Sequence, residues 1–452
     1  MTAGHSAWSR VFDAPSRRFL VVLLGWATFA ALPAVGQDIE REPINYSTAT
    51  PRNAVTRLEE RLAQGKAKLE FEPDHGYLRS LLRALEIPES SQVLVFSKTS
   101  MQRERISPKT PRAVYFNDDV MVGFCLRGRV LEIAAADEVV GTAFYTLDQM
   151  REEKPAPRRQ TESCLLCHSS SANQGIPGHL VRSLFVDRQG DPVFSKGSFR
   201  TDHTSPLAER WGGWYVTGTS GAQKHMGNMI SGGASRAEEM ANPDGVNVVD
   251  LKDRFTIALY PTPHSDIVAL MVLEHQAGML NRLARANLET RSALHYESEL
   301  NKAFRQPAAE KSESARSRIR SVGDAVVRYM LFQDEARLTE RVEGTSSFAA
   351  DFTARGPRDP KGRSLRDFDL KTRLFRYPCS YLIYSRAFDA LPSEVKVYVY
   401  QRLWDLLHGV RTKDDDPKLA ADDRAAILDI LRATKPDLPA SWKAAEPLKK
   451  RG

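Results

Sequence analysis

The sequence predicts an α+β protein in which a β-rich N-terminal half with antiparallel hairpins precedes an all-α C-terminal half. Two observations support this prediction. Between residues 92 and 148, short β-branched and aromatic runs alternate with turn residues, which is typical of an antiparallel meander. From residue 265 onward, apolar residues recur at helical spacing instead. Strands in one half and helices in the other favour α+β over alternating βαβ units.

Residues 1–36 have the three parts of a secretory signal peptide. Arg17 and Arg18 precede an apolar run over residues 19–32, and small residues follow at Ala34 and Gly36. The run is shorter than the roughly 20 apolar residues that span a membrane. We therefore expect export to the periplasm and cleavage of this segment, with an uncleaved N-terminal anchor as the alternative.

The mature chain is expected to contain three segments. Residues 37–90 are polar and extended apart from a helix predicted over residues 54–66, residues 91–262 are β-rich, and residues 263–452 are helical. The net charge of +7 is spread over 27% charged residues without a block of Lys or Arg. This composition does not indicate a nucleic-acid-binding protein.

Four runs predict the strands of the meander, with turn residues at 117–119 and 127–128 between them. These runs are residues 93–96, 113–116, 120–124 and 130–133. Turn residues at 187–191 predict a further hairpin, and residues 211–218 predict a strand before a Gly-rich loop.

The helical half begins with a capped helix. Ser265 and Asp266 are both suited to cap a helix that starts at Ile267. Its apolar stripe contains Ile267, Met271, His275, Met279 and Leu283. The other predicted helices contain residues 324–332, 381–390, 392–408 and 422–433, and a loop is predicted over residues 344–373.

Cys164-Leu165-Leu166-Cys167-His168 is the most informative pattern in the chain. Two thiols at this spacing can each form a thioether with a vinyl group of one porphyrin, and the following histidine can bind the iron. Zinc sites and redox dithiols also use Cys-x-x-Cys. However, no second Cys-x-x-Cys or His-x-x-x-His occurs in the sequence, and a dithiol does not need the histidine. The pattern predicts one covalent haem c in the β-rich half, with Cys164 and Cys167 as attachment points and His168 as the proximal iron ligand.

Two further cysteines, Cys125 and Cys379, lie in apolar contexts. They could pair as a disulfide in an oxidising compartment or remain as free buried thiols. The sequence leaves both alternatives open.

The face of the iron opposite His168 decides the function. A Met or His ligand there gives a closed electron carrier, whereas an open face lets peroxide or another small molecule bind. Met226 or His225, in a Gly-bounded loop, is expected as the distal ligand, although a loop residue that only fills space is the alternative. His275 is a further candidate, but a lone histidine on an apolar stripe is more often a hydrogen-bonded core residue.

A haem enzyme would also need polar groups near the iron. Arg200 and His203 are the catalytic candidates, on the basis of their proximity in the sequence. Arg182 and Arg200 could pair with the haem propionates, because arginine is suited to bidentate carboxylate contacts. His179 could cover the haem edge.

Four segments, together with the haem motif, carry a family resemblance. They are residues 199–206, 210–218, 264–271 and 381–385. The chain from about Ala113 to Pro439 resembles a group of exported, single-haem c-type cytochrome-like proteins of free-living bacteria. The resemblance implies haem binding by Cys164, Cys167 and His168, and electron transfer. It implies no substrate and no distal ligand.

The sequence as a whole predicts a periplasmic mono-haem c-type cytochrome that exchanges electrons with a periplasmic redox partner protein. The alternative is a haem peroxidase or small-molecule oxidoreductase with an open distal site, because a simple carrier rarely needs a chain of this length. A third hypothesis is a non-catalytic sensor or interaction module that uses the C-terminal helices. We expect no nucleic-acid partner, and no membrane span once the signal is cleaved.

Overall fold

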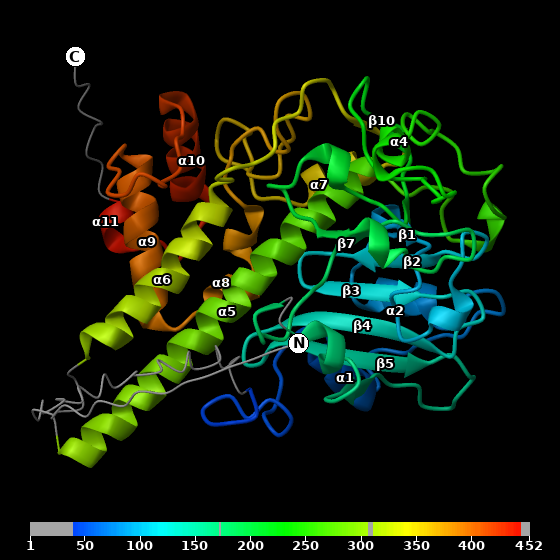
Figure 1. Ribbon diagram of the computed structural model, residues 1–452. Coiled ribbons are helices and arrows are strands. Elements are labelled where there is room, and N and C mark those ends of the chain that lie inside the picture. The colour runs from blue at the N-terminus through cyan, green and yellow to red at the C-terminus, as the bar shows by residue number, and fades with distance from the viewer. Residues whose placement is uncertain (1–38, 171–172, 306–310, 444–452) are drawn as a thin grey trace, which may run out of the picture. The chain divides into compact units, whose positions relative to one another are not determined.

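The computed structural model describes residues 39–170, 173–305 and 311–443, which belong to one compact unit, Gly36–Gly452. The predicted signal peptide lies outside the described residues. The mixed α+β class is confirmed, because an antiparallel sheet in the middle of the chain is followed by a helical C-terminal part (Figure 1). In the part of the chain that the structure describes, no helix is long and apolar enough to span a membrane. The three-segment division of the mature chain stays a prediction.

The main sheet has seven strands in the order β6-β5-β4-β3-β2-β1-β9, with every neighbouring pair antiparallel. The four predicted runs of the meander are confirmed as β1 to β4, which lie side by side in this sheet. The Asn117 carboxamide shapes the turn between β2 and β3 by accepting from the backbone N–H groups of Asp119 and Val120. The strands are β1 (Val93–Val95), β2 (Arg112–Phe116), β3 (Val120–Phe124), β4 (Val130–Asp137), β5 (Gly141–Asp148), β6 (Arg158–Gln160) and β9 (Trp214–Tyr215).

The strand predicted over residues 211–218 is much shorter than expected. Only Trp214 and Tyr215 pair with β1. Trp211 and Gly213 have φ angles of 68° and 81°, which extended backbone does not adopt. These positive angles turn the chain sharply before it reaches the sheet.

Successive side chains of a strand point to opposite sides of the sheet. Both faces of this sheet are buried, because other elements pack on each of them. One face, with Tyr115 and Val122, packs with helices α1 (Ala54–Ala63) and α2 (Leu78–Ala84). The other face, with Phe116, packs with the helical half. The predicted first helix is confirmed as α1, where Asn53 forms a capping box with Thr56.

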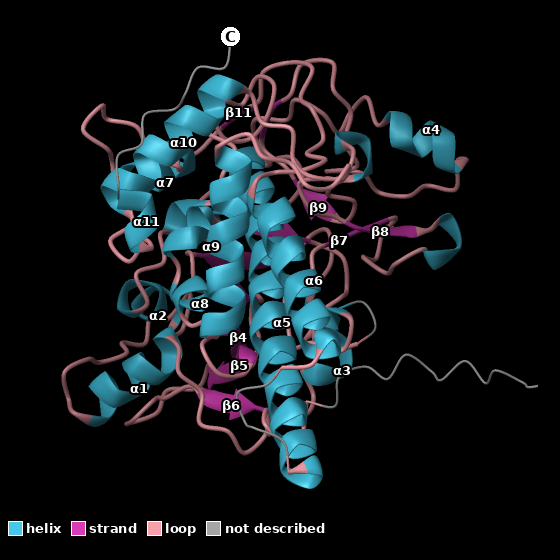
Figure 2. Cartoon of the chain, turned by 90° about the vertical axis from the view of Figure 1, so that its left-hand side faces the viewer, coloured by secondary structure: helices cyan, strands magenta, loops and turns pink. Residues whose placement is uncertain are grey.

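Helix α5 (Ile267–Phe304) is the central element of the helical half, and its 38 residues pack on the sheet side and on α6 (Glu313–Met330) (Figures 1 and 2). Its predicted start is confirmed, because the Asp266 carboxylate accepts from the backbone N–H groups of Val268 and Ala269. Its first turns are buried on all sides, since they lie between the sheet and the other helices.

The remaining elements correct two details of the predicted helical half. The loop predicted over residues 344–373 contains α7 (Phe348–Ala354), and the helix predicted over 381–390 is split into a 3₁₀ turn and α8 (Arg386–Asp389). The Ser385 hydroxyl caps α8 and causes this break. The other elements are α3 (Leu165–His168), α4 (Arg236–Ala241), α9 (Ser393–Leu407), α10 (Ala421–Thr434), α11 (Ala440–Lys443), β7 (Arg182–Leu184), β8 (Ser198–Arg200), β10 (Gly218–Thr219) and β11 (Glu343–Gly344).

Candidate functional site

The Cys-x-x-Cys-His pattern forms a single helical turn, α3, which follows edge strand β6 and lies beside α5 (Figure 2). Cys164 occupies the N-cap position, and its carbonyl accepts from His168 N at 3.0 Å. Residues three apart on a helix lie on the same side, so the turn brings the two thiols together. Cys164 is half-buried, Cys167 is exposed, and neither forms a disulfide. Both sulfurs are therefore available for covalent attachment.

The His168 imidazole is oriented by a backbone carbonyl. Its Nδ1 lies 2.8 Å from Gly178 O, so Nδ1–H is the donor and Nε2 carries the free lone pair. No described residue forms a hydrogen bond with Nε2. Burial lowers the pKa of His168, which keeps the ring neutral. A neutral imidazole whose second nitrogen is held by a backbone carbonyl is the usual arrangement of a metal-ligating histidine.

The loop after α3 holds this geometry in place. The His168 carbonyl accepts from both Gly178 N and Asn173 Nδ2 at 3.0 Å. The next residue, His179, exchanges two hydrogen bonds with the Asn281 carboxamide on α5, at 2.7 and 2.8 Å. The motif is thus anchored to the long helix through its own loop.

The sheet supplies the other side of the motif. The Phe144 ring of β5 lies 4.8 Å from the His168 ring. Arg112 of β2 and Glu132 of β4 form an ion pair at 2.7 Å. Burial raises the pKa of the Cys164 thiol to about 11, and the nearby Glu132 carboxylate adds to this shift while Arg112 opposes it. The ion pair therefore lies within electrostatic range of the attachment site.

The residues present fit a haem c. The two thiols share one side of a turn, and the histidine is neutral with an unpartnered Nε2. Within the described ranges no group of three or more His, Cys, Asp or Glu could hold a metal ion. A haem iron needs no such group, because the porphyrin supplies most of its ligands.

Met226 and His225, the expected distal ligands, are both buried, at 0% and 1% exposed. Met226 packs with Phe185 and Met229, and its Sδ accepts from Ser183 Oγ at 3.6 Å. The Nδ1 atom of His225 accepts from Gly227 N at 3.1 Å, and burial lowers the pKa of this histidine to about 4. No residue of the haem motif belongs to this cluster.

His203 and His275 are brought together by the fold, although 72 positions separate them. Their Nδ1 atoms lie 2.8 Å apart, so one ring donates to the other. His275 Nε2 lies 2.8 Å from Ser380 Oγ, which leaves no free nitrogen on this ring. Burial holds the pKa of both histidines well below its ordinary value, and the cations Arg282 and Arg210 lower that of His203 further.

Arg200 does not join this histidine pair. It lies exposed at the end of β8 and lines a cleft of about 420 Å³. The cleft is bounded by residues within 173–181, which follow the motif, by residues within 200–205, and by α5 and α6. Arg182, the other propionate candidate, is not among the lining residues.

Two features beside this cleft go beyond the sequence analysis, which named His179 only as a residue that could cover the haem edge and did not name Glu274. His179 is 4% exposed, and its Nε2 is buried without a hydrogen-bond partner. Glu274 and Arg210 form a fully buried ion pair at 3.2 Å, and burial raises the pKa of Glu274 to about 7. The only sequence signal was a carboxylate within the most apolar part of α5.

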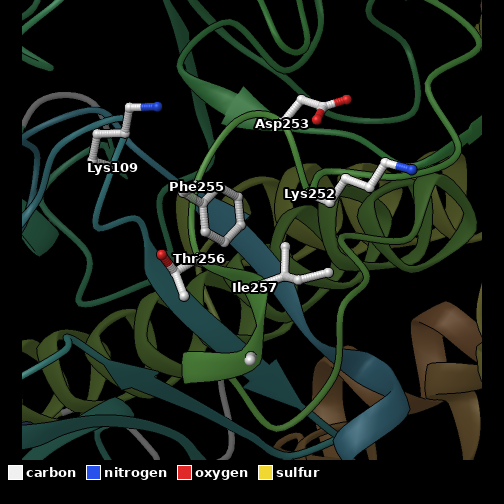
Figure 3. A pocket seen from close by; sticks show the side chains of 7 residues that line it. Lys109, Lys252, Asp253, Phe255, Thr256 and Ile257 are labelled. Carbon is white, nitrogen blue, oxygen red and sulfur yellow. The ribbon is translucent and has the colours of Figure 1, made fainter.

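A second hollow, of about 490 Å³, opens elsewhere on the surface and is shown in Figure 3. Its lining contains no histidine or cysteine, and the Lys109 ammonium donates to the Arg254 carbonyl. Nothing in this lining indicates redox or nucleophilic chemistry. The residues around it are Lys109, Lys252, Asp253, Phe255, Thr256, Ile257 and Ala258.

The two remaining cysteines, Cys125 and Cys379, are both free and buried. Burial raises the pKa of each thiol to about 12, so both stay protonated at neutral pH.

In the comparisons with known proteins, no family model, no curated protein and no solved structure matches the chain. The resemblance to cytochrome-like proteins therefore stays a prediction.

Proposed function

We propose that this protein is a periplasmic mono-haem c-type cytochrome that exchanges electrons with a periplasmic redox partner protein. In this proposal, Cys164 and Cys167 hold the porphyrin through thioethers and His168 Nε2 binds the iron. The bound haem would supply one-electron redox chemistry. The single observation that carries the proposal is the 2.8 Å bond from His168 Nδ1 to Gly178 O, because it presents Nε2 beside two accessible thiols.

The surface around the motif supports electron exchange with a partner protein. Cys167 and Leu166 are exposed. A porphyrin attached through an exposed thiol would have one edge near the surface, where a partner could approach. The full chain has a net charge of +7, and the predicted signal peptide accounts for +2 of it. The remaining +5 of the mature chain would favour encounter with an acidic partner.

Haem attachment is tested by producing the mature chain in a periplasm that contains haem-attachment machinery. We expect one haem per chain, measured by the pyridine haemochrome spectrum and by intact mass. The Cys164→Ala/Cys167→Ala variant should carry none, whereas the control Cys125→Ala, at a buried free thiol, should keep it. A native chain without haem, or a double variant that retains it, would overturn the proposal.

A second candidate function is a haem oxidoreductase with an open distal face. The cleft of about 420 Å³ favours it, because the loop that follows the motif forms one of its walls and His179 and Arg200 line it. Absorption spectra of the reduced protein with and without carbon monoxide separate the two functions. A low-spin spectrum that ignores carbon monoxide indicates a closed carrier, and a carbon monoxide adduct indicates an open site.

A further inference from the structure

The cleft beside the haem motif is electropositive. Three arginines line it, Arg200, Arg282 and Arg285, against a single carboxylate, Asp202. The wall also contains apolar side chains, among them Val181. A small cavity with an excess of cations and an apolar wall suits an organic anion with a short hydrocarbon part.

The three arginines differ in whether their guanidinium groups already have a partner within the protein. Arg282 lies 3.6 Å from Asp202 and stacks on Tyr329 at 3.6 Å, and Arg285 is paired with Glu289. Arg200 has no ion-pair or hydrogen-bond partner for its guanidinium among the described residues. Arg200 is therefore the group with free donors for an incoming anion.

His179 provides an independent indication of a ligand. It is 4% exposed and lines the cleft, yet its Nε2 is buried and has no partner in the described structure. A buried polar nitrogen left without a hydrogen bond is unfavourable, and in proteins such groups are usually satisfied by a bound molecule or water. A neutral imidazole with Nε2–H can donate to an anionic oxygen. Two hydrogen bonds with Asn281 fix the backbone of His179 to α5, and this residue lines the cleft.

We propose that this cleft binds carboxylate groups, with Arg200 and His179 Nε2 as donors. Two sources share this chemistry: a short soluble organic acid, and the propionates of a haem attached at Cys164 and Cys167. The soluble source is independent of the proposed haem function, whereas the propionate source rests on it.

The experiment uses the full-length mature protein as isolated, with its haem content measured first. Butyrate is the soluble probe, and butyramide, which has the same shape without the charge, is the ligand control. The variants are Arg200→Gln and His179→Phe, with Arg188→Gln as the matched control at an exposed turn of the neighbouring hairpin. Isothermal titration calorimetry measures binding, and resonance Raman spectra report the propionate bending bands.

If the ligand is soluble, butyrate binds and butyramide does not, and Arg200→Gln weakens butyrate binding by about tenfold or more while Arg188→Gln does not. If the propionates occupy the cleft, butyrate does not bind, and only Arg200→Gln and His179→Phe shift the propionate bands. Absence of butyrate binding together with identical Raman spectra for Arg200→Gln and Arg188→Gln overturns the proposal. A chain without haem refutes the proposed function, but the calorimetric result with butyrate still decides whether the cleft binds carboxylates.

Discussion

The histidines of this protein differ in which of their ring nitrogens form hydrogen bonds. His275 uses both nitrogens, with His203 and Ser380 as partners, whereas His168 uses Nδ1 alone and keeps Nε2 free. His179 keeps a buried Nε2 without a partner. Burial makes all four rings neutral, so hydrogen bonding rather than charge distinguishes a potential ligand from a structural histidine.

Gly178 tests how the motif is held. A Cβ at this position would lie 2.4 Å from Asn281 Oδ1 and 3.2 Å from Asn173 Nδ2, the two side chains that fix the loop. We expect Gly178→Ala to lower the free energy of unfolding by about 1–3 kcal/mol and to reduce haem loading. Urea unfolding and the haemochrome spectrum measure the two effects. Gly232→Ala is the control, because a Cβ there meets no atom within 4 Å; equal behaviour of the two variants would contradict the prediction.

Met226 tests the distal-ligand hypothesis. The side chain is fully buried with Phe185 and Met229, in a cluster that contains no residue of the haem motif. We expect Met226→Ala to lower the free energy of unfolding by about 2–5 kcal/mol through the cavity it leaves, with no change in the spin state of the iron. Thermal melts and absorption spectra measure both. Conversion to a high-spin spectrum would instead assign Met226 as the ligand.

At the scale of elements, the sequence predicted the starts of helices and the positions of strands better than the ends of helices and the pairing of strands. The residues 120–124 were predicted as a strand and form β3 with the same bounds, because β-branched and aromatic residues are bounded by turn residues on both sides. Helix α5 starts where its cap predicted, but its spacing indicated neither how far it runs nor that its first turns would be buried on all sides. Such burial depends on the neighbours that the fold assembles.

The contact between α5 and α6 gives a prediction at this scale. In isolation, Gly278→Ala should favour helix α5 by about 1 kcal/mol. In the folded protein, however, a Cβ at this position would lie 2.0 Å from the Tyr329 hydroxyl of α6. We expect a net loss of about 1–3 kcal/mol in the free energy of unfolding, measured by urea titration. Ser298→Ala, at an exposed site on the same helix, is the control and should leave the free energy of unfolding unchanged or slightly higher. A Gly278→Ala protein more stable than the native one would contradict the prediction, because it would mean that α5 and α6 move apart at little cost.

At the scale of the whole molecule, the buried His203–His275 pair links stability to pH. Both folded-state pKa values are lowered, so as pH falls below about 6.5 the unfolded chain binds protons that the folded chain does not. The contribution of the pair is fully present above that pH and is lost below it, by about 1.4 kcal/mol per pH unit for each histidine. The charged groups that act on the pair are Arg282, Arg210 and Asp202, and the Tyr329 ring packs against both imidazoles.

Urea unfolding between pH 8 and pH 5 measures this dependence. Glu274 acts in the opposite direction, because its pKa is raised to about 7 and it binds a proton more readily in the folded state. The comparison is therefore made with the His203→Gln/His275→Gln variant, which keeps Glu274. We expect a smaller loss of stability on acidification in the variant than in the native protein. Parallel curves would contradict the assignment to this pair.

The sequence by itself determined the α+β class and predicted the chemistry of the motif. The spacing of Cys164, Cys167 and His168 is local, and so are the strand runs and the Asp266 cap, so each can be read from residues a few positions apart. Only the tertiary structure decided which nitrogen of His168 is free, that His203 meets His275, and that Arg200 and His179 share a cleft with α5 and α6. These features join groups on separate elements, and their positions follow from packing around the whole core, which no local spacing records.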